Sequence, residues 1–158
     1  MLNPTPTSLT APTIDLLDIN VWLALADENH IHHVRARGYW EAESTPQIAF
    51  TRVTMLGFVR LLTNHKVMQG NPFTAHQAWD AYRAFRKLPE IIWMGELDED
   101  ALATDDVLVK WIGRAGFSTL HWTDGYLAAM AEMYGCRLVS FDGGFERYQP
   151  LNFLHLIN

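Results

Sequence analysis

The sequence is poor in cysteine, in long apolar runs and in positive charge. Cys136 is the single cysteine among 158 residues, so no disulfide can form within the chain, which is typical of a reducing, cytoplasmic setting. No stretch approaches the roughly 18 apolar residues of a membrane span, and we expect no membrane partner. Residues 1–12 lack the basic and apolar regions of a signal peptide, and we expect them to form a flexible tail before a single domain over residues 13–158.

Basic residues are outnumbered, because 12 Lys and Arg stand against 18 Asp and Glu, for a formal net charge of −6. This balance argues against a protein that coats nucleic acid nonspecifically, since such binding needs an electropositive face. It leaves open an enzyme that binds a few phosphates beside metal ions, because bound cations reverse the local sign of an acidic site. Hydrophobic residues make up 49% of the chain, which is typical of a folded protein.

Short apolar runs alternate with helical patterns along the chain. The runs predict strands over residues 14–17, 47–50, 91–94 and 137–141, and an edge strand within 151–157. Apolar spacing and capping residues predict helices over residues 20–26, 32–42, 51–62, 74–88, 98–112 and 123–135. Such alternation favours a parallel sheet covered on both faces. We therefore expect a three-layer α/β/α fold with a short, mostly parallel central sheet.

Three aspartates stand where these elements begin or end. Asp18 and Asp142 each follow an apolar strand, and Asp124 lies at the start of a helix. Taken singly, each is more often a cap or turn residue. Taken together, clustered carboxylates would repel one another and raise one another's pKa. A hard divalent cation such as Mg²⁺ or Mn²⁺ offsets that repulsion, so we predict that the three acids form a metal site.

The chemistry suited to such a site is phosphodiester hydrolysis, because a bound metal lowers the pKa of a water and stabilises the leaving oxygen. The sequence contains no Gly-rich Walker loop and no Gly-x-Ser-x-Gly elbow. A nucleotide cradle and a serine hydrolase are therefore disfavoured. Another metal-dependent phosphohydrolase stays open, whereas a receiver-like phosphoacceptor would need a lysine near the acids, and none lies close in sequence.

Three further side chains are candidates to support the acids. Asn20 follows Asp18 by two residues and is expected to fix its carboxylate. Thr123 either caps its helix or binds a metal-bound water. Arg60 lies on an otherwise apolar helix face, where it forms a structural ion pair, pairs with a site carboxylate or holds a phosphate.

Several stretches resemble the PIN domain family, and more closely its VapC-type toxins. The matching stretches are residues 16–25, 30–33, 57–63, 123–129 and 138–145, and the resemblance spans about residues 13–156. It implies a Mg²⁺-dependent endoribonuclease that acts on RNA, is usually a homodimer and is neutralised by a small VapB-like antitoxin. In this resemblance Asp18, Asp124 and Asp142 match the acids of the family, and Asn20 matches the polar residue that supports the first acid.

One position departs from the family pattern. Met55 stands in the helix before Gly57 where the family usually has a glutamate, and a thioether is a poor Mg²⁺ ligand. Three acids then remain in place of four, unless Glu96, Asp98 or Glu99 substitutes. This departure motivates an alternative reading, in which the chain is a catalytically silent PIN-like binding protein that acts through its partner.

Overall fold

A five-stranded parallel sheet forms the centre of the fold, with the strand order β3-β2-β1-β4-β5. The computed structural model describes residues 11–96 and 98–157, so most of the predicted tail lies outside the described residues. The strands are β1 Ile14–Leu17, β2 Gln47–Phe50, β3 Ile91–Trp93, β4 Arg137–Ser140 and β5 Phe153–His155. All four strand pairings are parallel, which confirms the predicted sheet and extends it to the edge strand β5.

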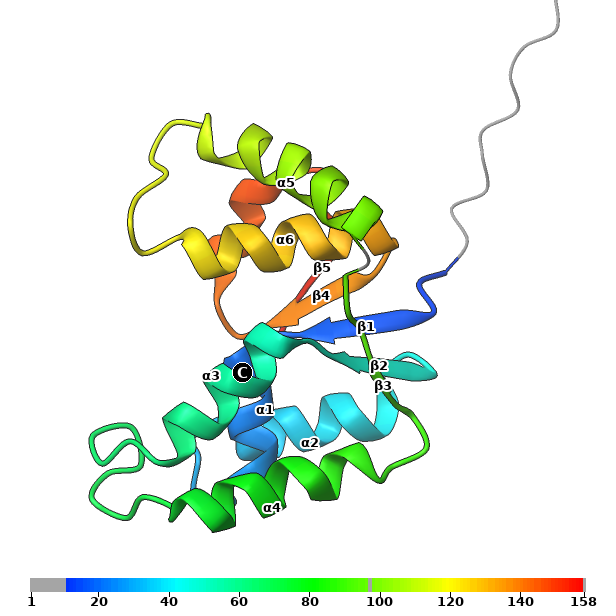
Figure 1. Cartoon of the computed structure of the whole chain (residues 1–158). Helices are drawn as coiled ribbons and strands as arrows, with labels where there is room; N and C mark the ends of the chain where they lie inside the picture. The colour runs from blue at the N-terminus through cyan, green and yellow to red at the C-terminus, as the bar shows by residue number, and fades with distance from the viewer. Residues whose placement is uncertain (1–10, 97, 158) are drawn as a thin grey trace, which may run out of the picture.

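Helices cover both faces of this sheet (Figure 1). One layer holds α1 Ile19–Ala26, α2 His33–Ala42, α3 Arg52–Leu62 and α4 Ala75–Arg86. The other holds α5 Asp98–Ile112 and α6 Trp122–Tyr134, together with the 3-10 helix η1 Gly143–Tyr148. The predicted three-layer α/β/α architecture is therefore confirmed. Among the described residues, no helix has the length and apolar character to cross a membrane.

The hydrophobic core has two parts, one on each face of the sheet, and strand β1 contributes side chains to both. Successive strand side chains point to opposite faces. Accordingly, Leu16 packs in the core beneath α5 and α6, whereas Leu17 packs in the core beneath α1 to α4. Both side chains are fully buried, as expected of a central strand in a parallel sheet. Asp18 directly follows this strand, so packing on both faces of the sheet fixes the position of its backbone.

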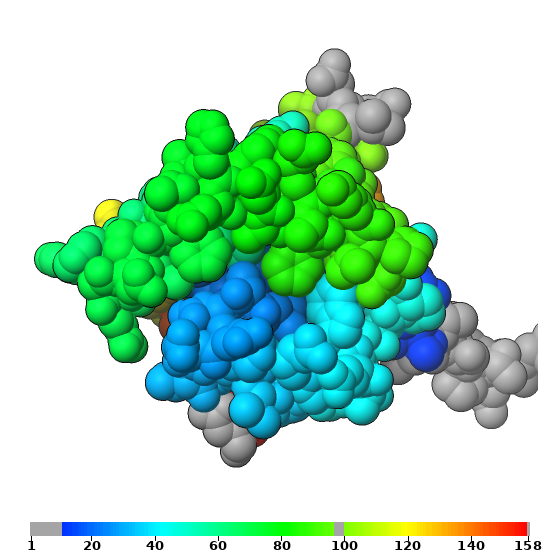
Figure 2. Space-filling model, turned by 90° about the horizontal axis from the view of Figure 1, so that it is seen from below, coloured from blue at the N-terminus to red at the C-terminus, as the bar shows by residue number. Residues whose placement is uncertain are grey.

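Aromatic side chains pack together in the layer that holds α1 to α4. Figure 2 shows the outer face of this layer, with α1, α2 and α4 side by side. Trp22 of α1 stacks on Phe50 of β2 with 3.7 Å between ring centroids. Phe85 of α4 meets Trp22 and Trp40 at 5.2 and 6.1 Å. Trp22 is thus a core residue that ties α1 to the sheet and to α4, and it fixes the helix whose first turn follows β1.

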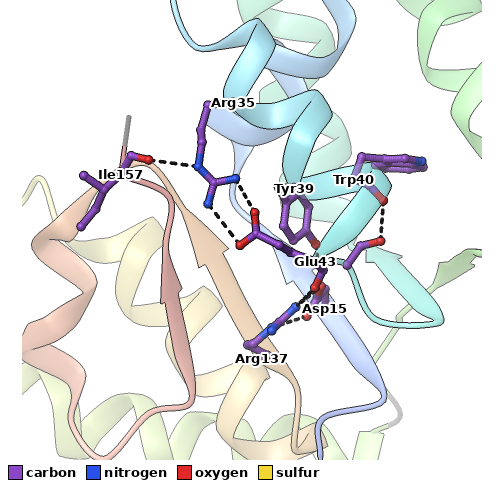
Figure 3. Close-up of polar contacts among 8 residues, drawn as sticks. Asp15, Arg35, Tyr39, Trp40, Glu43, Arg137 and Ile157 are labelled. Atoms are coloured by element: carbon purple, nitrogen blue, oxygen red, sulfur yellow. Dashed lines mark hydrogen bonds and ion pairs between the residues drawn. The ribbon is translucent and has the colours of Figure 1, made fainter.

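A buried ion pair holds the opposite end of β1 (Figure 3). Asp15 and Arg137 are partners in the β1–β4 register, and Arg137 Nε and Nη2 donate to the Asp15 carboxylate at 2.8 Å each. Tyr39 Oη and the backbone N–H of Thr45 donate to Asp15 Oδ2 at 2.5 and 3.0 Å. Burial and the Asp15 carboxylate raise the pKa of Tyr39 far above its ordinary range. Asp15 is therefore a fully paired structural carboxylate.

Candidate active site

Asp18 lies at the carboxyl end of β1, where it is the N-cap of α1. Only 8% of the residue is exposed. Its Oδ1 accepts a hydrogen bond from the backbone N–H of Ile19 at 2.7 Å, and its Oδ2 accepts one from Ser140 Oγ at 2.7 Å. Burial nevertheless raises the pKa of Asp18 to about 6, against the lowering effect of these two bonds, and Asp124 and Asp142 raise it further.

Ser140 is the residue that the sequence analysis missed. While its Oγ donates to Asp18, it also accepts hydrogen bonds from Asn20 Nδ2 at 3.0 Å and from the backbone N–H of Asp142 at 2.9 Å. Asn20 Oδ1 in turn accepts from the backbone N–H of Phe141 at 3.3 Å. Asn20 thus reaches Asp18 through Ser140. The sequence signal was a lone hydroxyl inside the apolar run of β4.

Asp142 and Asp124 complete the acidic group from two other segments. Asp142 follows β4 and caps η1, with its Oδ1 accepting from the backbone N–H of Gly144 at 2.7 Å. Asp124 lies half-buried in the first turn of α6. Burial first, and then the charge of Asp142, raises the pKa of Asp124 to about 6, while Arg147 opposes the shift. The charges of Asp124 and Asp142 therefore act on Asp18, and the charge of Asp142 acts on Asp124.

The arrangement fits a hydrated cation better than a closed metal cage. Across residues 11–96 and 98–157, no three His, Cys, Asp or Glu side chains form a ready ligand set. Mg²⁺ usually keeps several waters and takes one or two carboxylates directly. The donors present are hard oxygens, which suit Mg²⁺ or Mn²⁺, and burial disfavours the ionised form of Asp18 and Asp124. That Asp18, Asp124 and Asp142 together hold such a cation stays a prediction.

The structure places two predicted supporting residues differently. The N-cap of α6 is His121, which excludes the first of the two roles considered for Thr123, the helix cap, while its second role, binding a metal-bound water, stays a prediction. Thr123 lies exposed in the first turn, one residue before Asp124. Arg60 is exposed near the end of α3 and lines a groove with Trp79 and Arg83 of α4. No aspartate of the acidic group lines that groove, and a role for Arg60 at the site stays a prediction.

Neither Met55 nor Glu96 supplies the fourth acid of the family pattern. Met55 is 3% exposed and packs in the core beneath α1 to α4. Glu96 accepts a hydrogen bond from Tyr126 Oη at 2.7 Å, and it is not among the charges that shift the pKa of Asp18 or Asp124. The side chains of Asp98 and Glu99 lie outside the described residues.

Similarity to known proteins agrees with this fold. The PIN domain model matches residues 16–150. Ribonuclease VapC41 of Mycobacterium tuberculosis is 34% identical over 140 residues, or 84% of this chain and 92% of that protein.

Two solved structures share the fold. VapC20 of Mycobacterium tuberculosis, a Sarcin-Ricin loop cleaving toxin, matches with a TM-score of 0.64 at 17% identity, covering 87% of this chain and 97% of that one. VapBC2 from Rickettsia felis, bound to a DNA fragment from their promoter, matches with a TM-score of 0.61 at 12% identity, covering 90% and 98%.

The structure is a three-layer α/β/α protein with a parallel sheet, in which Asp18 follows β1, Asp142 comes after β4 and Asp124 lies in the first turn of α6. Together with the match over most of the sequence, it shows that the chain belongs to the PIN domain family, among its VapC-type members. The resemblance stated from the sequence motifs is thereby confirmed.

Proposed function

We propose that this protein is a metal-dependent endoribonuclease and the toxin of a VapBC-type toxin–antitoxin pair. The observation that carries the proposal is that two acids from separate segments, Asp18 and Asp124, have a pKa raised to about 6, first by burial and then in part by the charge of neighbouring carboxylates such as Asp142. Such an arrangement costs stability in the absence of a cation, and perturbed groups of this kind gather at functional sites. The similarity to a protein named as a ribonuclease supports RNA as the substrate.

In this proposal Asp18, Asp124 and Asp142 hold Mg²⁺, or Mn²⁺ in its place. When bound, the cation supplies Lewis acidity, which makes a water more acidic and neutralises charge that develops on phosphate oxygens. Ser140 keeps one oxygen of Asp18 in a fixed direction, and Asn20 orients Ser140. Burial of Asp18 keeps its carboxylate from turning freely into solvent, so its ligand direction is set before RNA binds.

The partners follow from the same family likeness. The VapBC2 match supports a VapB-like antitoxin as the protein that neutralises this chain. We further propose that the protein forms a homodimer and acts in the cytoplasm, on the cell's own RNA. Co-expression with the product of a short neighbouring reading frame, followed by purification through a tag on one partner, tests the antitoxin assignment directly.

The nuclease assignment is tested by incubating total RNA with the protein in Mg²⁺ and in EDTA. We expect fragments in Mg²⁺ only, and none from Asp18→Asn. The control is Asp106→Asn, which removes an exposed carboxylate of α5 and should leave cleavage unchanged. Intact RNA in Mg²⁺ with the wild-type protein, or full cleavage by Asp18→Asn, would reject the assignment.

Met55 favours one alternative, a PIN-like protein that binds its partner without cleaving RNA. The buried thioether occupies the position where the family usually carries a fourth acid, so metal affinity is the deciding property. Calorimetric titration with Mn²⁺ separates the two readings. Binding at or below millimolar concentration, lost in Asp18→Asn, supports the nuclease, and no binding at that concentration supports the silent protein.

A further inference from the structure

Arg147 of η1 spans the gap between the two segments that carry Asp142 and Asp124. Its Nε donates to the carbonyl oxygen of Gly144 at 2.9 Å, and the backbone N–H of Gly144 donates to Asp142. Its Nη1 lies 2.8 Å from Nε2 of His121, the N-cap of the helix whose first turn holds Asp124. The guanidinium therefore contacts Gly144, near Asp142, and His121, near Asp124.

This side chain is held in one orientation before any ligand binds. Arg147 Nη1 lies 2.8 Å from His121 Nε2, and the backbone N–H of Ser118 donates to the other ring nitrogen, Nδ1, at 3.0 Å, so the imidazole is held from both sides. Arg114 supports the backbone underneath, because its guanidinium donates to the carbonyl oxygens of Arg147 and Gln149 at 2.9 and 3.0 Å. The cation is therefore preorganised.

Arg147 also has capacity left for a ligand. It is exposed, and in the described part of the chain it takes part in none of the ion pairs. Its Nη2 makes no hydrogen bond to any described residue, since its contacts use Nε and Nη1. Its charge acts on Asp124, where it counters the rise in the pKa of that carboxyl. A fixed, exposed cation thus stands beside carboxylates in a chain of net charge −6.

We propose that Arg147 binds a backbone phosphate of the RNA beside the acidic group, through Nη2 and the open face of its guanidinium. The choice of RNA as ligand rests on the proposed function. Three carboxylates repel a phosphodiester, and a rigid guanidinium matches the geometry of phosphate oxygens. Arg147 is then a substrate-binding residue that sets where the backbone lies relative to Asp124 and Asp142.

RNA binding in EDTA tests this role without cleavage as the readout. The parent protein is Asp18→Asn, and the probe is a fluorescently labelled single-stranded RNA followed by anisotropy over a range of salt concentrations. Arg147→Gln removes the charge and keeps a donor for Gly144. We expect it to weaken binding about tenfold and to make the slope of log K against log salt shallower by about 0.7, the value for one lost phosphate contact on a single strand.

Two further variants make the result specific. Arg37→Gln removes an equal charge from the exposed Arg37–Glu41 pair of α2 and should leave the slope unchanged. Arg147→Lys keeps the charge and should keep the slope, with weaker binding because the fork is lost. Melting curves of all variants confirm that each is folded before its binding is compared.

The outcomes separate this inference from the nuclease assignment. Equal slopes for Arg147→Gln and Arg37→Gln, or no RNA binding by the parent protein, overturn the role of Arg147, even if the wild-type protein cleaves RNA in Mg²⁺. A shallower slope in Arg147→Gln alone supports the role. That result stands even where the wild-type protein leaves RNA intact, in which case only the nuclease assignment fails.

Discussion

Ser140 Oγ lies 2.7 Å from Asp18 Oδ2 and joins the end of β4 to the first turn of α1. This bond lowers the pKa of Asp18 against the much larger effect of burial. The same hydroxyl receives hydrogen bonds from Asn20 and from the backbone of Asp142. Ser140 therefore connects both strand-terminal acids, although it is itself a weak metal ligand.

Replacing this hydroxyl should change the pH dependence of cleavage. In Ser140→Ala the Asp18 carboxylate loses a donor, so its pKa rises and the acid limb of the pH–rate profile moves to higher pH. We also expect a loss of about 1–3 kcal/mol in stability, because buried polar groups lose their partner. Rates measured from pH 5 to 9 check the shift. Ser44→Ala, which removes a bond to the Trp40 carbonyl on α2, should leave the profile in place, and an unshifted profile in Ser140→Ala would contradict the role.

The acids should also make the metal-free protein less stable as the pH rises. Asp18 and Asp124 have ordinary pKa values of 3.8 that folding raises to about 6, so the folded state holds more protons between these values. Their contribution to stability is fully present below pH 4 and is lost as the pH rises through 6. One pKa unit corresponds to about 1.4 kcal/mol, so the loss amounts to a few kcal/mol.

Urea unfolding at pH 4.5, 5.5 and 7.5 measures this loss. Asp18→Asn keeps an oxygen for the Ile19 cap and removes the charge, so its stability should fall less over the same range. Mg²⁺ binds the ionised carboxylates, and we expect it to stabilise the wild-type protein at pH 7.5 and much less at pH 4.5. If the stability of the wild-type protein and that of Asp18→Asn fall equally between pH 4.5 and 7.5, ionisation of the buried Asp18 is not the cause of the loss.

The sequence predicted the fold well because the fold depends on local patterns. The apolar runs of β1 and β4 and the Thr74–Gln77 capping box, which is present in α4, are signals within a few residues. The sequence also singles out these acids as candidates, because Asp18 directly follows β1 and Asp142 comes two residues after the end of β4. Parallel pairing of β1 with β4 then brings these two ends together.

The remainder of the site depended on contacts that no local pattern encodes. Asp15 lies within β1 and Asp18 directly follows it, and the contacts of Asp15 with Arg137 and Tyr39 assign it to structure. By sequence Ser140 is one more strand residue, and only its hydrogen bonds with Asp18, Asn20 and Asp142 reveal its role. Thr123 looked like a cap because it is a good one by type, yet α6 begins one residue earlier, after His121. Tertiary packing decided each of these cases.

The Asp15–Arg137 ion pair should contribute strongly to the free energy of unfolding, at the end of β1 that lies away from Asp18. Arg137→Met leaves Asp15, which is 0% exposed, without its cation, and loss of one partner of a buried pair costs about 3–5 kcal/mol. Adding Asp15→Asn to this variant should recover part of the loss. The matched control is Arg37→Met, which breaks the exposed pair with Glu41 and should cost less than about 1 kcal/mol. Equal losses in urea unfolding for the two single variants would contradict the assignment.

Gly57 allows α3 to approach α1 just behind Asp18. A Cβ at Gly57 would lie 2.2 Å from Cδ1 and 2.9 Å from Cγ1 of Ile19, the residue whose N–H binds the Asp18 carboxylate. Gly57→Ala should therefore cost about 1–3 kcal/mol through overpacking, and it should reduce cleavage because Ile19 is pushed away with the cap.

A second substitution, at Ile19, should relieve the clash that Gly57→Ala creates. Ile19→Val removes Cδ1, the atom in the closest contact, so the Gly57→Ala/Ile19→Val double variant should be more stable than Gly57→Ala alone. The coupling energy from the four proteins of the cycle measures this contact directly. Gly38→Ala on α2, where a Cβ would meet nothing within 4 Å, is the control and should be neutral or slightly stabilising. Additive effects at positions 57 and 19 would show that the two helices do not meet there.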